Sequence, residues 1–195
     1  MRVFQTVKAK LRRQPRKQRW AKQKLALVRI AVFAMLGTIM FLSKQVLAFL
    51  PNVELVSTLT MVYTLVYRRQ ALIPIFLFIL MQGVVAGFGL WWVPYFYLWP
   101  FLWGVTMLLP GKLPPKLAKP VYAVVCGLFG LAFGTLYAPF QTLAFFGGDW
   151  SKTPAWIIAG LPWDAVHALG NFSLGLLIVP LETLLRRLEN GLQRR

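Results

Sequence analysis

The residues that could do chemistry in this sequence are few, and three of them follow helical spacing near the C-terminus. Asp164, His167 and Asn171 lie at positions i, i+3 and i+7, so a helix would present all three on one face. A carboxylate, an imidazole and an amide suit hydrogen bonding to a polar ligand or to a neighbouring helix. Both interpretations stay open: a ligand pocket, or a polar contact that fixes helix packing.

Other polar groups occur in strongly apolar surroundings. Lys44 and Glu54 flank a short connection that contains Pro51, and Gln82 lies within a stretch free of charge. An ionisable side chain at bilayer depth costs about 2.5 to 3.5 kcal/mol on insertion scales, so such groups usually face a cavity or a partner. We therefore predict that these three residues contribute to a polar pocket that opens outward.

Aromatic residues gather near the same predicted outer surface. Their rings suit stacking on a flat heterocyclic ligand, but they also suit the aromatic belt at a membrane interface. The group comprises Trp91, Trp92, Tyr95, Tyr97 and Trp99.

Patterns typical of enzymes and metal centres are missing from the sequence. There is no Gly-x-Ser-x-Gly elbow and no His-Glu-x-x-His motif, and one Cys and one His exclude the usual multi-His metal cluster. Nothing supports a dyad of Cys126 with His167. Gly111-Lys112 is followed by Leu113, so it is no phosphate loop. We expect no catalytic residue, no metal, no cofactor and no ATP hydrolysis by this chain.

Composition and charge place the chain in a membrane. Of 195 residues, 58% are hydrophobic and 15% aromatic, which is too apolar for a soluble domain of this length. The formal charge is +17, but eleven of the 22 basic residues lie within the first 29 positions. A basic run beside a membrane span indicates attraction to anionic lipid and an orientation signal, so we expect no nucleic-acid partner.

The apolar segments predict an all-α, polytopic bundle of six transmembrane helices. Each span needs about 20 apolar residues. The uncharged stretch from Gln70 to Gly111 is long enough for two spans, which turn where Gly and Pro interrupt it. A basic cytoplasmic tail, 1–24, precedes the transmembrane domain, 25–195. The predicted spans are 25–50, 53–67, two within 70–111 that turn at 87–94, 121–137 and 155–187, with a loop over 138–154.

The positive-inside rule sets the orientation. With the N-terminus inside, the cytoplasmic side collects all but two of the basic residues; only Lys44 and Lys152 fall on the outer half. We therefore expect both termini in the cytoplasm and a multi-pass protein of the inner, or cytoplasmic, membrane.

Three segments resemble the substrate-binding S component of energy-coupling factor transporters. They are Leu50-Pro-Asn-Val-Glu-Leu-Val56, Gly87-Phe-Gly-Leu-Trp-Trp-Val-Pro-Tyr95 and Gly160-Leu-Pro-Trp-Asp-Ala-Val-His-Ala-Leu-Gly-Asn-Phe172. The similarity covers about residues 29 to 188. It implies a six-helix bundle that captures a vitamin or related micronutrient from outside the cell, together with a transmembrane T component and two cytoplasmic ATPases.

The resemblance also assigns residues. It implies ligand contacts at Glu54, Gln82, Trp92, Asp164, His167 and Asn171, and Lys44 is added on chemical grounds. In the family, an Ala-x-x-x-Ala pair in the first helix lets the T component approach closely. Here the strict spacing is absent, and a face of small residues takes its place in the expected contact with the coupling partner. That face comprises Ala31, Ala34, Gly37 and Thr38.

Two other classes of function stay open. A self-sufficient secondary carrier is usually larger or visibly duplicated, and no internal repeat is visible here. An intramembrane enzyme would need Asp164 or His167 to be chemically essential. The family's members take different vitamins, so the resemblance does not choose a ligand.

Overall fold

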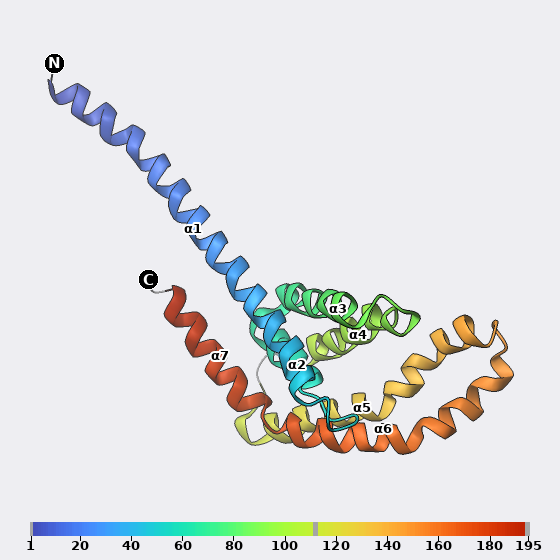
Figure 1. Cartoon of the computed structure of the whole chain (residues 1–195). Coiled ribbons are helices and arrows are strands. Elements are labelled where there is room, and N and C mark those ends of the chain that lie inside the picture. The colour runs from blue at the N-terminus through green and yellow to red at the C-terminus, as the bar shows by residue number, and fades with distance from the viewer. Residues whose placement is uncertain (1, 111–112, 194–195) are drawn as a thin grey trace. The chain divides into compact units, whose positions relative to one another are not determined.

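The computed structural model describes residues 2–110 and 113–193, with side chains from Trp20 onward except at 21, 22, 115 and 193. Within these ranges the chain forms helices and no strand, which confirms the predicted all-α class. The helices are α1 (Arg2–Val46), α2 (Val56–Tyr67), α3 (Leu72–Ala86), α4 (Tyr95–Leu108), α5 (Pro115–Phe145), α6 (Thr153–Gly175) and α7 (Ile178–Gln193), with short 3-10 turns η1 (Arg68–Ala71), η2 (Leu90–Trp92) and η3 (Trp150–Lys152) (Figure 1).

The chain divides into two compact units, residues 1–36 and 37–195. The first consists of the greater part of α1. Most side chains of the predicted basic tail lie outside the described residues. The second unit contains the end of α1 and all later helices, and the cavity described below belongs to it.

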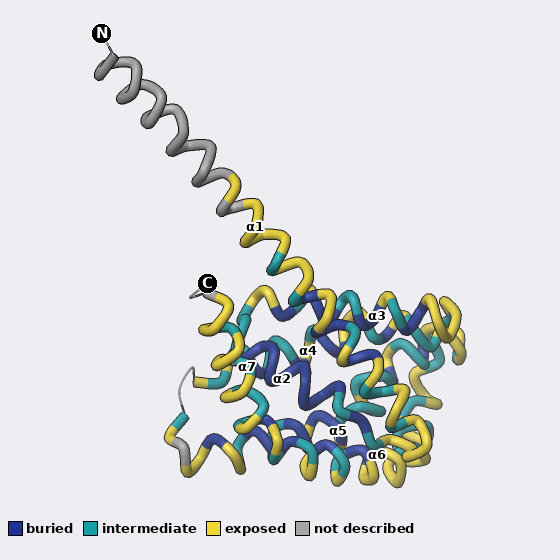
Figure 2. The backbone as a smooth tube through the Cα atoms, turned by 60° about the vertical axis from the view of Figure 1, so that its left-hand side comes forward, coloured by how far each residue is buried: buried dark blue, intermediate teal, exposed yellow. Residues whose placement is uncertain are grey.

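Helix α2 is the core of the second unit. Ten of its 12 residues are buried, and it contacts α4, α5, α6 and α7 (Figure 2). Two of its buried hydroxyl groups find partners inside the protein: Thr64 donates to the carbonyl of Thr60 at 2.6 Å, and Thr58 Oγ1 lies 3.9 Å from Cys126 Sγ. These short polar side chains let an apolar helix pack on all sides.

The chain reverses direction at η1. Arg68, which follows α2, has a positive φ of 54°. Its guanidinium donates to the carbonyl of Met107 at 3.1 Å, and Trp103 Nε1 donates to the carbonyl of Arg68 at 3.0 Å. The end of α2 is therefore held against the end of α4, and α3 starts back from that point.

The predicted break at 87–94 is present. Helix α3 ends at Ala86, and Gly87 follows with φ +87°, a conformation that favours glycine. Trp92 Nε1 then donates to the carbonyl of Ile79 at 2.7 Å, which folds the connection back over α3. Helix α4 begins after Pro94.

Helices α5 and α6 form a long antiparallel hairpin (Figure 1). The structure differs from the sequence prediction here, because α5 runs on to Phe145 through residues expected to be a loop. Pro139 lies inside the helix; it removes the bond to the carbonyl of Thr135 without ending the helix. At the tip, hydrogen bonding from Ser151 lowers the pKa of the exposed Asp149 below its usual value.

The predicted sixth span is two helices rather than one. Helix α6 ends at Gly175, and α7 continues at an angle of 48°. At the break, the backbone N–H groups of Leu176 and Leu177 donate to carbonyls three residues earlier, not four as in an α-helix. The acceptors are Ser173 and Leu174. Pro180, in the first turn of α7, has no N–H to offer the carbonyl of Leu176, so a straight helix cannot continue through the break.

Several described helical stretches are long and apolar enough to cross a membrane. The second of them is interrupted by η1, and a fourth is added if the bent pair α6–α7 counts as one span. The chain therefore has the helices of a membrane protein. The stretches are 23–46, 56–86 and 116–145, with 150–175 and 178–192 as the bent pair.

The contact of α5 with α6 depends on Gly130. A Cβ added there would lie 2.8 Å from the carbonyl oxygen of His167 and 2.9 Å from Asn171 Nδ2. We expect Gly130→Ala to lower stability by about 1 to 3 kcal/mol through overpacking, seen as a lower thermal midpoint of the detergent-purified protein. Gly160→Ala in α6 is the matched control, since its Cβ meets open space. Equal midpoints for the two variants would contradict this packing.

Candidate functional site

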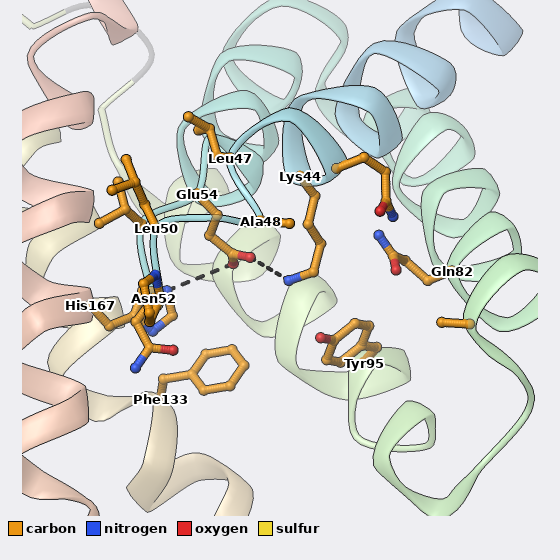
Figure 3. Close-up of a pocket in the computed structure, with 14 residues that line it drawn as sticks. Lys44, Leu47, Ala48, Leu50, Asn52, Glu54, Gln82, Tyr95, Phe133 and His167 are labelled. Carbon is orange, nitrogen blue, oxygen red and sulfur yellow. Dashed lines mark hydrogen bonds and ion pairs between the residues drawn. The ribbon is translucent and has the colours of Figure 1, made fainter.

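A cavity of about 400 Å³ lies where five helices and one connection meet. Helix α1 supplies Lys44, α3 supplies Gln82, α4 supplies Tyr95, and α5 and α6 supply Phe133 and His167 (Figure 3). The connection from α1 to α2 forms the rest of the wall. The remaining lining residues are Gln45, Leu47, Ala48, Leu50, Pro51, Asn52, Val53, Glu54 and Ala86.

The α1–α2 connection is tightly folded, and its local structure places two charges at the cavity. Asn52 has a φ of 58°, which Asn tolerates better than most residues, and its side-chain amide donates to the carbonyl of Trp163 at 3.3 Å. Lys44 lies in the last turn of α1 and Glu54 lies just before α2. Each charge therefore has the sign that a helix dipole favours at that end.

Three titratable side chains form one cluster in the cavity wall. Lys44 Nζ lies 2.5 Å from Glu54 Oε2, and His167 Nε2 lies 3.7 Å from Glu54 Oε1 (Figure 3). The Glu54 and His167 side chains are only 10% and 6% exposed, whereas Lys44 keeps 28%. Lys44 Nζ also lies 5.8 Å from the centre of the Tyr95 ring. Each oxygen of Glu54 thus faces one nitrogen-bearing side chain.

Gln82 adds a buried amide to this wall. The residue is 3% exposed, and its Nε2 has no hydrogen-bond partner among the described residues. Its side chain points toward Lys44 across the cavity (Figure 3). Leaving a buried donor unsatisfied costs about 1 to 3 kcal/mol, so such a group in a cavity is a candidate for a ligand contact.

The predicted polar face of α6 is buried, but its three residues do different things. Asp164 Oδ1 accepts from the backbone N–H of Gly134 in α5 at 3.1 Å, and Asn171 Nδ2 donates to Ser57 Oγ in α2 at 3.0 Å. Only His167 lines the cavity. Asp164 and Asn171 connect α6 to its neighbours, so their predicted ligand contacts stay predictions.

Trp92 and most of the predicted aromatic group also lie outside the cavity lining. Trp92 packs edge-on against Phe88 and Phe96, with ring centres 5.0 and 4.5 Å apart. Tyr95 is the member that lines the cavity, and Trp91 packs edge-on against it at 5.6 Å. The structure therefore brings together Lys44, Glu54, Gln82 and His167 of the seven predicted ligand residues.

Phe133 and Asn52 are two of the wall residues that the sequence analysis did not assign to the site. Phe133 packs against the His167 ring with centres 5.0 Å apart, yet it is one of many aromatic residues in an apolar helix. Asn52 follows Pro51 in a turn, which was the available signal for an unusual backbone conformation.

The predicted coupling residues are divided between the two units. Ala31 and Ala34 belong to residues 1–36, and Gly37 and Thr38 belong to the second unit. Gly37 faces Leu77 of α3, whose side chain would lie 2.8 Å from an added Cβ. Its small size is thus used within the protein, and the contact with a partner stays a prediction.

No metal site is visible among the described side chains, where no group of three or more His, Cys, Asp or Glu residues gathers. In comparisons with known proteins, no family model, curated protein or solved structure matches the chain.

The buried Lys44–Glu54 pair predicts how substitutions at these positions change the free energy of unfolding. We expect Lys44→Met to cost about 3 kcal/mol of unfolding free energy, because it leaves the Glu54 carboxylate buried and unpaired. Adding Glu54→Gln should restore stability to within about 1 kcal/mol, since both charges are then gone. Chemical unfolding in detergent measures both variants.

The exposed pair of Lys152 with Asp149, at 3.2 Å, provides the control. Lys152→Met there should cost under about 1 kcal/mol. A double variant at positions 44 and 54 that is less stable than Lys44→Met alone would show that the pair is not what Lys44 stabilises.

Proposed function

We propose that this protein captures a vitamin or related micronutrient from outside the cell and delivers it to an ATP-driven energy-coupling factor transport complex. The observation that carries the proposal is the cavity with its buried cluster of Lys44, Glu54 and His167, its aromatic wall, and its Gln82 Nε2, which has no partner among the described residues. Its volume of about 400 Å³ lies within the range of small-molecule sites.

The polar groups of the cavity favour capture over a purely structural role. Polar groups held in an apolar protein without partners cost stability, and bundle packing alone does not require them. In α6, Asp164 and Asn171 already make the polar contacts that fix the helix against α5 and α2. His167 and Gln82 are left facing the cavity.

The partners of the proposal follow from the resemblance to S components. A capture protein without a phosphate loop depends on other subunits for energy. We infer a transmembrane T component and two cytoplasmic ATPases, and no enzyme activity of this chain. The face around Ala34 remains the proposed contact with the T component.

We further propose that the chain spans the inner, or cytoplasmic, membrane six times, with both termini in the cytoplasm. The end of α1 and the starts of α2 and α4 lie at the cavity together with the end of α3, so these helices alternate in direction. At the opposite end, Arg68 contacts α4, and Arg186 donates to the carbonyl of Leu65 at 2.6 Å. Basic residues thus gather away from the cavity, as the positive-inside rule requires of a cytoplasmic end.

Single cysteines test this topology. The natural cysteine, Cys126, is buried. It is replaced by Ala first, so that each variant carries a single cysteine. We expect Ser151→Cys, at the tip of the α5–α6 hairpin, to react with a membrane-impermeant maleimide in intact cells. Asn190→Cys, in α7, should react only after permeabilisation. Reaction of both positions in intact cells would contradict the six-span arrangement.

Ligand capture is tested on protein purified in mild detergent, by mass spectrometry of the small molecules extracted from it. We expect a stoichiometric compound with the wild type and its loss with His167→Ala, which removes a cavity side chain without breaking the Lys44–Glu54 pair. Gln70→Ala, an exposed change in η1, is the control and should retain the compound. Retention of the compound by His167→Ala would place the ligand elsewhere.

The same preparations separate the other classes of function. Uptake by proteoliposomes that contain this chain alone would favour a secondary carrier. Turnover of the compound by the purified protein, lost on Asp164→Asn, would favour an intramembrane enzyme. Uptake that needs the T component and the ATPases would support the proposed complex.

A further inference from the structure

The buried side-chain atoms of the cavity wall that lack a hydrogen-bond partner among the described residues are both nitrogens, Gln82 Nε2 and His167 Nε2. Both oxygens of Glu54 already face nitrogen-bearing side chains, Lys44 on one side and His167 on the other. An ammonium group has three donors, and Glu54 takes one of those of Lys44. Gln82 Nε2 has two donors and no partner among the described residues. A ligand that fits this wall must bring acceptors.

The charges of the lining residues further restrict the chemical class of the ligand. A cationic ligand would need a free carboxylate, but the only carboxylate among the described lining residues is Glu54, which is paired with Lys44. A hydroxyl or primary amide brings acceptors together with donors, and Glu54, the lining carboxylate that could accept from those donors, already faces Lys44 and His167. A carboxylate is an acceptor-only group, and bonds from an ammonium or an amide to it are among the stronger hydrogen bonds.

The arrangement of the cavity wall indicates where such a carboxylate would bind. Lys44 and Gln82 come from different helices and both line the cavity; the Gln82 side chain extends toward Lys44, whose ammonium points to Glu54 (Figure 3). Tyr95 and Phe133 bound the same space below them, and aromatic rings suit an apolar or planar body. Lys44 and Gln82 thus form a polar part of the wall, and the rings of Tyr95 and Phe133 offer a surface against which a ring of the ligand can pack.

We propose that the cavity binds a small ring-containing monocarboxylate, with its carboxylate seated between Lys44 Nζ and Gln82 Nε2 and its ring against Tyr95 and Phe133. This assignment rests on the proposed capture function and names the chemical class of the captured solute. Lys44 keeps its bond to Glu54 and uses its remaining donors for the ligand.

The test uses a panel of aromatic and alicyclic monocarboxylates, each paired with its own primary amide. Retention by the detergent-purified protein is measured for each acid and amide by mass spectrometry at one pH and one salt concentration. We expect at least one acid to bind about tenfold or more tightly than its amide. Equal retention of acids and amides, or no acid retained at millimolar concentration, would overturn the assignment.

Two variants locate the carboxylate. Gln82→Leu keeps the size of the side chain and leaves the Lys44–Glu54 pair intact, and it should remove most of the preference for acids over amides. Gln70→Leu, the same change at an exposed position in η1, should keep that preference. An unchanged preference in Gln82→Leu would overturn the assignment. Size-exclusion profiles matching the wild type show that each variant is folded.

The compound extracted from cells distinguishes this inference from the capture function itself. A stoichiometric compound that lacks a carboxylate overturns the carboxylate assignment and leaves capture intact. A compound that carries a carboxylate and is lost from Gln82→Leu supports both. An acid-selective panel result with wild-type protein supports the carboxylate assignment even where the extract is empty.

Discussion

The structure depends on one constraint: polar groups inside an apolar protein must be paired by the protein itself. Helix α2 meets it with hydroxyl groups that bond to its own backbone and to a neighbour, as Thr64 and Ser57 show. In helix α6, Asp164 Oδ1 accepts from the backbone of Gly134. Six buried side-chain atoms have no hydrogen-bond partner among the described residues, and two of them, Gln82 Nε2 and His167 Nε2, belong to residues that line the cavity.

The cavity arises from where helices stop. Helix α1 ends at Val46 and α2 starts at Val56, so a connection of nine residues is folded over the space that straight helices would have filled. Gly87 ends α3 on the same side. The charged pair and the amide are therefore carried by helix ends and a short connection, while the long helices α5 and α6 supply a rigid wall with Phe133 and His167.

Local features could be predicted from the sequence, and long-range ones could not. Helical spacing correctly placed Asp164, His167 and Asn171 on one buried face, and Gly87 correctly marked a break. Spacing did not reveal that Asp164 meets Gly134, 30 positions away, or that Asn171 meets Ser57, because these contacts are set by packing between helices. The sequence predicted a loop over 138–154, yet α5 stays helical to Phe145, where it is paired with α6.

The short separation of Lys44 and Glu54 has a consequence for biosynthesis. The two residues are ten positions apart. Lys44 lies in the last turn of α1 and Glu54 lies just before α2, so the pair connects these two helices. A charge that enters the bilayer alone is costly, whereas a neutralised pair is less so. This pair is available as soon as α1 and α2 have left the ribosome, before the helices that carry Gln82 and His167 have emerged from it. The first two helices of the chain can therefore match their charges with each other before the later helices join them.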